Sequence, residues 1–240
     1  MKKTALILII IAAIVSCNKE TPSGGEGGGK APDTVMAVDL GLSVKWASCN
    51  VGASSPEEYG NYFAWGETAP KSEYTYKSYK WSYDETILVT RYCISPEDGY
   101  NGFTDGKSTL LPEDDAATVN WGKEWRTPTI ENWEELLNNC ILEFGRLDGV
   151  PGVRLTSTKA GYTENWIFLP SMQIWHPGDG TIPPQAVDDY LSGAYWSSSL
   201  RMDYASHARH LSFLYFNNKP SVNLPANDRV FGMPVRPVCK

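Results

Sequence analysis

Residues 122–136 read GKEWRTPTIENWEEL and contain the start of the one segment of this chain that is clearly helical in pattern. Thr129 is the predicted N-cap, because a threonine side chain accepts a hydrogen bond from the first free backbone N–H groups of a helix. Acidic residues follow, beginning with Glu131, and they suit the positive end of the helix dipole. Spacings of three, four and three give one apolar stripe, which consists of Ile130, Trp133, Leu137 and Cys140. We therefore predict a helix from Thr129 that packs by this stripe.

Short alternating or aromatic stretches lie on both sides of this helix, between turn signals. The predicted strands are Val35–Leu40, Val44–Ser48, Tyr59–Trp65, Gly152–Ser157, Trp166–Leu169, Ala194–Ser198, Ala208–Phe216 and Gly232–Val238. The intervals between them are long, and residues 67–120 carry Tyr, Ser, Asp and Gly without clear periodicity. The pattern predicts a loop-rich domain with few regular elements.

The amino terminus carries a short export signal. Met1-Lys2-Lys3 supplies positive charge, an apolar run extends from Thr4 to Val15, and Ser16-Cys17 follows. The run is about twelve residues long, too short to cross the roughly 30 Å hydrocarbon core of a bilayer. Residues 14–17 resemble the lipobox of bacterial lipoproteins, in which the cysteine is lipidated and becomes the new amino terminus. We predict a lipoprotein signal peptide over residues 1–17, with Cys17 lipidated and holding the mature chain to a membrane.

Residues 18–34 are predicted to form a flexible tether. They are rich in glycine and contain no aromatic residue, so this segment cannot bury enough surface to fold. A Gly-rich coil of this length sets the following domain on the order of 20 Å from the membrane. Asn18-Lys19-Glu20 resembles the charged signal that directs some lipoproteins to the outer face of the outer membrane. We therefore expect an outer-membrane lipoprotein at the cell surface.

Residues 35–240 are predicted to form a single domain, since about 200 residues suffice for a substantial core. The formal net charge of −7 and the lack of any basic block argue against a nucleic-acid partner. Besides Cys17, the cysteines allow three disulfide pairings, which stay open beside the alternative that at least two are buried free thiols. Their spacing matches no zinc pattern. They are Cys49, Cys93, Cys140 and Cys239.

The domain also carries a series of tryptophan-centred motifs in a set order. They are Val38–Leu42, Lys45–Ala47, Cys49–Gly52, Gly122–Thr129, Trp133–Leu136, Ile167–Pro170, Tyr195–Ser199 and Gly232–Val238. Together they resemble the Fibrobacter succinogenes major paralogous domain and its relatives among secreted bacterial lipoproteins, over most of residues 38–238. The resemblance implies an α+β, C-type-lectin-like fold, with small antiparallel sheets, one or two helices and long loops. The fold that the resemblance implies is related to the scaffold of formylglycine-generating enzymes. Such a scaffold hosts unrelated activities, so the function stays open.

The large side chains in these motifs are predicted to have structural roles in packing and hydrogen bonding. Arg126 and Arg236 are expected as buried or half-buried donors to loop carbonyls or carboxylates, since arginine offers five N–H donors in a fixed fork. Ser197–Ser199 lack the Gly-x-Ser-x-Gly elbow of a nucleophile and are expected to pack in a strand with locally bonded hydroxyls. The tryptophans are expected in the core, and they include Trp125, Trp133 and Trp196.

Metal binding receives little support from the sequence. His207 and His210 lie three apart in a strand-like stretch, which sends them to opposite faces, and His176 lies in a turn. None of the acidic clusters matches an EF-hand, and the pairings with which C-type lectins bind calcium and sugar are absent. We predict no metal site, with calcium in acidic loops as the alternative. Those loops contain Asp98 and Asp105, Glu113–Asp115, and Asp179 with Asp188–Asp189.

No catalytic constellation emerges, and we predict that the chain is not an enzyme. A glycosidase needs two carboxylates placed across a cleft. Glu134, Glu135 and Asp188 are available, but any acidic chain supplies such residues. The cysteines form no close pair in sequence of the kind that oxidation chemistry in formylglycine-type relatives would use.

Aromatic residues are concentrated between Tyr59 and Tyr100, and two interpretations are open. Tyrosine and tryptophan offer flat apolar faces with polar tips, which suit protein and sugar ligands. The alternative is that these rings bury a long loop against the sheet. We predict a non-catalytic binding or adhesion module for an extracellular glycan or protein, or alternatively a structural subunit of a surface assembly or polysaccharide-utilisation system. The candidate ligand-binding residues are Tyr74, Tyr76, Tyr79 and Trp81.

Overall fold

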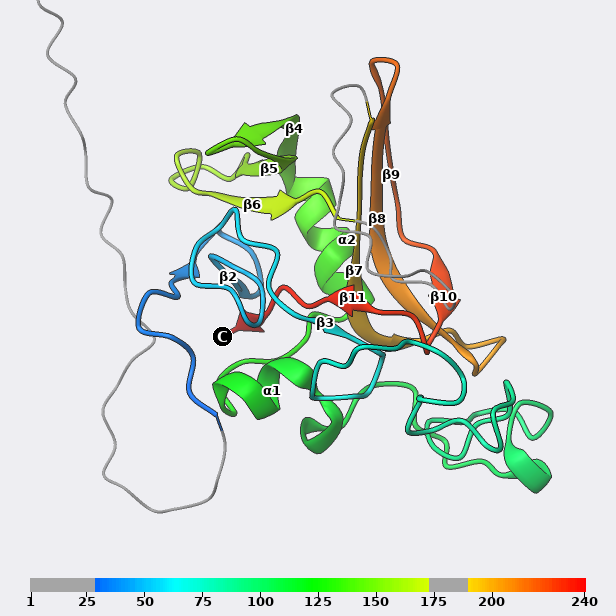
Figure 1. Cartoon of the computed structure of the whole chain (residues 1–240). Helices are drawn as coiled ribbons and strands as arrows, with labels where there is room; N and C mark the ends of the chain where they lie inside the picture. Colours follow the sequence, from blue (N-terminus) through cyan, green and yellow to red (C-terminus); the bar gives the residue numbers. More distant parts are fainter. Residues whose placement is uncertain (1–28, 173–189) are drawn as a thin grey trace, which may run out of the picture.

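A computed structural model describes residues 29–172 and 190–240 (Figure 1). It is a mixed α+β structure of mostly small antiparallel sheets with few helices, which confirms the predicted class. Two 3₁₀ turns lie at Tyr100–Gly102 and Pro112–Asp114. The helices are α1 (Ala116–Trp121) and α2 (Ile130–Asn139). The strands are β1 (Ala37–Val38), β2 (Lys45–Ala47), β3 (Tyr62–Phe63), β4 (Cys140–Leu147), β5 (Val150–Ser157), β6 (Trp166–Pro170), β7 (Tyr190–Leu200), β8 (His207–Phe216), β9 (Lys219–Asn223), β10 (Ala226–Asp228), β11 (Met233–Pro234) and β12 (Val238–Cys239).

Helix α2 begins as its sequence predicts. The Thr129 hydroxyl accepts a hydrogen bond from the Asn132 N–H at 3.4 Å, and the Asn132 side chain accepts from the Thr129 N–H at 3.1 Å. This reciprocal capping box satisfies two N–H groups that would otherwise lack partners. The predicted stripe needs two corrections. Leu136 is buried and Leu137 is half-buried, although both fall on the core face of a 3.6-residue helix. Cys140 caps the helix and begins β4.

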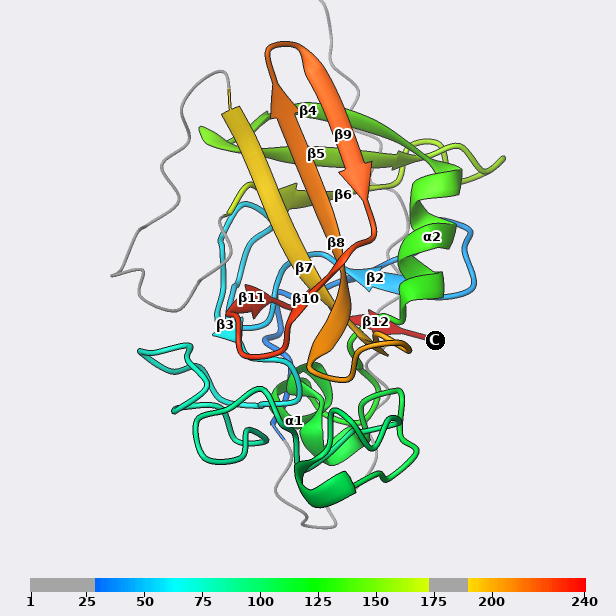
Figure 2. The same cartoon turned by 90° about the vertical axis from the view of Figure 1, so that its right-hand side faces the viewer.

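Each predicted strand overlaps an observed strand, whereas β4, β9 and β10 were not predicted. The strand pairings tie distant parts of the chain together. Sheet β1-β2-β12 joins the beginning of the described domain to its end. Strands β4, β5 and β6 form an antiparallel meander, and β7 and β8 form a long hairpin to which β9 and β10 add. Figure 2 shows the β4–β6 strands behind the β7–β9 strands, with α2 beside both. One core cluster fills the space between them and includes Trp46, Trp133, Tyr195, Leu211 and Phe213.

The two arginines singled out from the sequence are buried or half-buried donors, as predicted. Arg236 is fully buried, and its guanidinium donates to the Asn50 side chain and to the carbonyls of Ala47 and Phe168 at 2.7–3.1 Å. Arg126 is half-buried and donates to the Asn132 side chain at 2.9 Å. The tryptophans of the motifs are in the core, as expected. Arg236 therefore ties β2, β6 and the carboxyl-terminal segment together.

All four cysteines of the domain are free and buried. This outcome excludes the disulfide pairings left open by the sequence. Burial raises the pKa of the Cys140 thiol to about 11, since an apolar environment disfavours the charged thiolate. The folded domain also begins earlier than residue 35. The Gly29 N–H bonds to the Val119 carbonyl at 3.0 Å, and Ala31 packs on the core.

Candidate functional site

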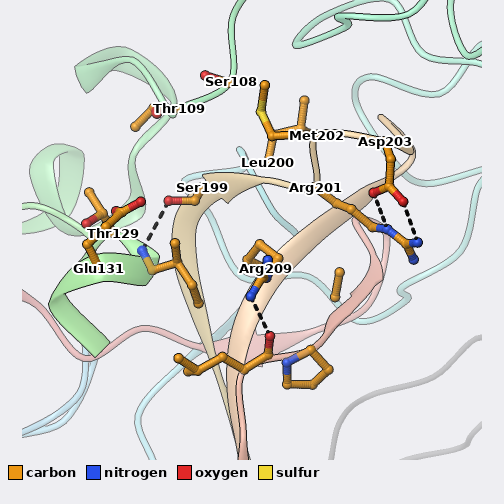
Figure 3. A pocket seen from close by; sticks show the side chains of 14 residues that line it. Ser108, Thr109, Thr129, Glu131, Ser199, Leu200, Arg201, Met202, Asp203 and Arg209 are labelled. Atoms are coloured by element: carbon orange, nitrogen blue, oxygen red, sulfur yellow. Dashed lines mark hydrogen bonds and ion pairs between the residues drawn. The ribbon is translucent and has the colours of Figure 1, made fainter. Parts of the chain in front are cut away.

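A groove of about 760 Å³ with mixed polar and apolar walls lies where α2 begins, beside the turn between β7 and β8 (Figure 3). Its walls come from residues 108–109, 129–131, 199–203, 209 and 224–226, which are far apart in sequence. Pockets of this size accommodate small organic ligands. The groove is therefore a candidate binding site, and each wall has a local structural cause.

A bulge in β7 forms one wall. Trp196 pairs with His210 and Leu200 pairs with Ala208, so β7 advances four residues where β8 advances two. The extra residues lie within Ser197–Ser199. A bulge bends its strand and re-aims side chains. Here it carries Ser199 to α2, where the Ser199 hydroxyl accepts a hydrogen bond from the Ile130 N–H at 3.1 Å. Ser197 and Ser198 bond to nearby carbonyls, as the sequence predicted.

Arg209 of β8 brings positive charge into the groove (Figure 3). It is half-buried, and it donates one hydrogen bond to a described residue, from Nη2 to the Leu224 carbonyl at 2.8 Å. Its Nε is buried and has no partner among the described residues. Arg209 also forms no ion pair within the described parts of the chain. A guanidinium carries five N–H donors, so most of the donors of Arg209 remain available.

The rim of the groove holds further charges. Arg201 donates from Nε and Nη2 to the two carboxylate oxygens of Asp203 at 2.7 and 2.9 Å. This pair lowers the pKa of Asp203 to about 2, mainly through the hydrogen bonds from Arg201, with Arg209 adding to the effect. Glu131 lies on the opposite wall, in the first turn of α2. The Arg201–Asp203 pair is internally neutral, so Arg209 and Glu131 set the remaining charge.

Hydroxyl groups complete the lining. Ser108 and Thr109 form no side-chain hydrogen bond with any described residue, and the Ser199 hydroxyl acts there as an acceptor alone. These groups are therefore free to donate to a ligand. Met202 is 65% exposed at the rim. None of the described residues that line the groove is aromatic.

The groove contains no nucleophile paired with a base. Its hydroxyls lack a histidine neighbour, since His207 and His210 are not among the residues that line it. Activation of a serine requires a base within hydrogen-bond reach. Among the described residues that line the groove, no hydroxyl is paired with a histidine, and the arrangement is consistent with binding.

Ser206, His207 and Asp228 come together beside the groove without forming a catalytic triad. Ser206 Oγ lies 3.0 Å from His207 Nδ1, and Asp228 lies 3.8 Å from the same nitrogen. A triad needs the acid and the nucleophile on different ring nitrogens. Burial lowers the pKa of His207 despite Asp228. As predicted for a strand, His210 is on the other face, buried against Trp196.

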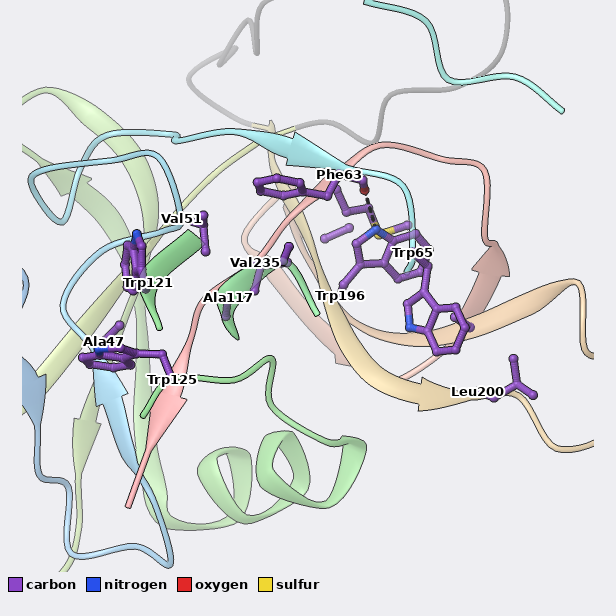
Figure 4. Packing of buried hydrophobic residues seen from close by; sticks show 14 of the residues in the cluster. Ala47, Val51, Phe63, Trp65, Ala117, Trp121, Trp125, Trp196, Leu200 and Val235 are labelled. Carbon is purple, nitrogen blue, oxygen red and sulfur yellow. Dashed lines mark hydrogen bonds between the residues drawn. The ribbon is translucent and has the colours of Figure 1, made fainter. Parts of the chain in front are cut away.

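The long loop over residues 67–103, which we call the aromatic loop, differs most from the prediction. Tyr74 and Tyr79 were predicted as ligand-binding residues, but they are only 1% and 5% exposed. Their hydroxyls donate to the carbonyls of Tyr62 and Trp65 at 2.6 and 2.8 Å. Trp65 itself lies in the core beside Trp196 (Figure 4). These tyrosines bury the loop against the core, which was the alternative interpretation.

Tyr76 and Trp81 are half-buried. The Tyr76 hydroxyl donates to Asp228 at 2.5 Å. Lys80 and Arg91 lie 4.2 and 5.0 Å from the Trp81 ring centre, so cations already contact this ring. The four candidates therefore do not form one open aromatic surface.

Arg229 explains why the loop is held so firmly. It is fully buried, donates from Nε to the Tyr79 hydroxyl at 2.9 Å, and donates to the carbonyls of Arg91, Tyr92 and Ala205. The Trp65 ring centre lies 4.8 Å from its guanidinium carbon. One buried arginine thus joins the loop to the turn between β7 and β8 and to the core, and it does so without a carboxylate among the described residues.

A different set of apolar side chains is exposed, at the tip of the same loop. Tyr83, Ile87 and Phe103 are 36%, 47% and 36% exposed. Tyr83 stacks on Tyr100 with 3.3 Å between ring centres. We call Tyr83, Ile87, Tyr100 and Phe103 the loop tip. Tyr83 and Tyr100 belong to the aromatic region noted in the sequence, but neither was among the candidate ligand-binding residues.

The acidic clusters that the structure describes have structural roles. Asp115 is buried and caps α1, accepting from the N–H groups of Ala117 and Thr118. Asp105 accepts from the N–H groups of Tyr92 and Cys93. No group of three or more metal-binding side chains comes together within residues 29–172 and 190–240. The predicted candidates at His176, Asp179 and Asp188–Asp189 lie outside the described residues.

Comparison of the chain with protein-family models, curated proteins and solved structures finds no match. Within the described residues, no helix has the length and apolar character needed to span a bilayer. Inference about the function of this chain therefore rests on the geometry of the groove.

Most residues of the groove were not predicted as site residues from the sequence. Ser199 was noticed, but as a packed strand residue, and Arg209 had no distinguishing pattern. The run of serines was the available signal, since three small polar residues in a strand are compatible with a bulge. Nothing local indicated that the start of α2 and residues 224–226 would meet there.

Proposed function

We propose that this chain is a cell-envelope lipoprotein whose domain is a non-catalytic binding or adhesion module for an extracellular glycan or protein. The groove carries this proposal, because it combines suitable volume, free hydroxyls and an unpaired arginine with no reactive pair. We also propose that the domain is C-type-lectin-like. Its small antiparallel sheets, flanking helix and long loops are compatible with that fold.

Anchoring through Cys17 remains part of the proposal. The lipobox-like segment and the glycine-rich stretch after it support a domain tethered to the outer membrane at the cell surface. Binding would then occur outside the cell. Protease treatment of intact cells should remove the domain if this placement is correct.

The test of binding uses the purified full chain in detergent on an array of glycans and matrix proteins, with calcium and with chelator. Thr109→Trp should strongly weaken selective binding, because Thr109 is exposed in the groove and an indole there obstructs part of it. Thr90→Trp is the matched control, since Thr90 is an exposed threonine outside the groove. Selective binding that survives Thr109→Trp would remove the groove as the site, and a silent array would count against the module itself.

The loop tip supports the second candidate function, a structural subunit of a surface assembly or polysaccharide-utilisation system. Exposed aromatic and aliphatic side chains are typical of protein contacts. Ile87→Glu should release co-purifying membrane proteins if the tip holds them. Unchanged co-purification would argue against this role for the tip.

A further inference from the structure

We infer that the groove takes a glycan bearing carboxylate groups, of the uronic-acid class. This inference rests on the proposed function and names its ligand chemistry. It depends on the state of Arg209, on the composition of the lining, and on the balance of charge between the two walls.

The position and free N–H groups of Arg209 suit the binding of an anion. Arg209 projects from the rigid strand β8, whose register with β10 places Ala226 opposite it. The bond to the Leu224 carbonyl fixes the guanidinium through Nη2 and leaves Nη1 without a described partner. A planar guanidinium with free N–H groups matches a carboxylate in a two-point contact, and such charge-assisted bonds are about twice as strong as neutral ones.

The remaining lining favours a sugar as the bearer of that carboxylate. Ser108, Thr109 and Ser199 present hydroxyls that can exchange bonds with sugar hydroxyls. Because none of the described lining residues is aromatic, ring stacking adds nothing to affinity in the groove. Recognition of a neutral sugar would then rest on neutral hydrogen bonds that water replaces at little cost. The charged contact with Arg209 supplies the binding affinity that ring stacking does not provide here.

Two carboxylates of the protein also lie in the groove. Asp203 is held by both nitrogens of Arg201, which largely cancels its charge toward a ligand. Glu131 has no described ion-pair partner and opposes an incoming anion from the α2 wall. Removal of the Glu131 charge should therefore strengthen binding of an acidic glycan, whereas removal of the Arg209 charge should weaken it.

The experiment compares two ligands that differ in charge and by one methyl group per sugar, an oligosaccharide of galacturonic acid and its methyl ester. Binding to the purified full chain is measured by calorimetry at low salt. We expect the acid to bind at least ten-fold more tightly than the ester. The affinity for the acid should fall with added salt, and that for the ester should not.

Variants assign the effect to the groove. Arg209→Gln should weaken binding of the acid about ten- to hundred-fold and leave the ester unchanged, and Arg209→Lys should fall between. Glu131→Gln should strengthen binding of the acid a few-fold. Arg154→Gln is the matched control. Arg154 lies outside the groove, in the β4–β6 sheet, where it stacks on Trp166 at 4.2 Å from the ring centre. Near-ultraviolet circular dichroism of each variant confirms the fold, and Glu131→Gln tests the inference even if Arg209 variants fold poorly.

The outcomes separate this inference from the proposed function. Equal binding of acid and ester, or an unchanged affinity in both Arg209→Gln and Glu131→Gln, overturns the carboxylate preference while leaving a glycan-binding module in place. Binding of acidic peptides in preference to the glycan also overturns it. Failure of both oligosaccharides and of every glycan on the array rejects the inference and the glycan function together.

Discussion

Replacement of Tyr79 by phenylalanine removes a single hydroxyl from the contact between the aromatic loop and the core. That hydroxyl donates to the Trp65 carbonyl at 2.8 Å and accepts from Arg229 Nε at 2.9 Å. The phenyl ring keeps the buried apolar contact of the tyrosine, which is 5% exposed. The substitution therefore isolates the two hydrogen bonds.

The cost follows from what the hydroxyl leaves behind. The Trp65 carbonyl loses a donor, which costs about 1 kcal/mol, and the charged guanidinium of Arg229 loses an acceptor, which costs about 2 kcal/mol. Both groups are buried, so water does not replace the missing partner. We expect the free energy of unfolding to fall by about 3 kcal/mol and the melting temperature to fall by roughly 6–12 °C for a domain of this size.

The assay is urea unfolding of the full chain, followed by tryptophan fluorescence. Tyr76→Phe is the matched control, because its hydroxyl bonds to Asp228, whose side chain is 25% exposed and can turn to water. We expect that control to lose about 1 kcal/mol or less. A loss below roughly 0.5 kcal/mol for Tyr79→Phe, or equal losses for the two variants, would refute the anchoring role assigned to Tyr79.

Three further predictions concern the anchor, a buried histidine and the thiols. Cys17→Ser should move the protein from the membrane fraction to the soluble fraction, because no acyl chain can then be attached, as immunoblots of fractionated cells would show. Burial lowers the pKa of His210 to about 4, whereas an unfolded histidine titrates near 6.5. The unfolded chain therefore binds the proton first, and the free energy of unfolding should fall by about 3 kcal/mol as the pH falls from 7 to 4, by urea titration at each pH. The buried thiols should resist iodoacetamide at pH 8 in the native chain and all react in urea, as read by mass spectrometry, and they are Cys49, Cys93, Cys140 and Cys239.

Each of these predictions has a contrary result. Membrane retention of Cys17→Ser would show that something other than a lipid holds the chain. His210→Gln should flatten the pH dependence more than His207→Gln does, since His207 is less buried, and the reverse order would contradict the assignment. Thiols that stay unreactive in urea without reductant would indicate disulfides in place of the free cysteines.

The start of α2 was predictable because its determinants are local. Thr129 and Asn132 lie three residues apart, and one helical turn brings them together without help from the rest of the fold. The burial of Leu136 in preference to Leu137 was not predictable in the same way. Both residues lie near the centre of the apolar face, and the packing against β4, β7 and β8 selects between them.

The aromatic loop shows why composition did not reveal exposure. Lysines near Tyr74 and Tyr79 do not place that stretch in water: Lys71 lies 5.4 Å from the Tyr74 ring centre and pairs with Glu67 at 2.8 Å. A long amphipathic side chain covers an aromatic ring as readily as it signals water. The partner that holds Tyr79 is Arg229, 150 residues further along the chain.

Sequence alone was enough to place two features that depend on neighbouring residues, the small strands and the cap of α2. The export signal with Cys17 and the tether stay predictions. Burial of the tyrosines, the free state of the cysteines and the groove depend on contacts between distant segments. Arg209 meets Leu224 across a strand pair, and Ser199 reaches Ile130 through a bulge. Such contacts form when the sheets pack around a shared core. A local sequence pattern does not indicate which loops this packing brings together.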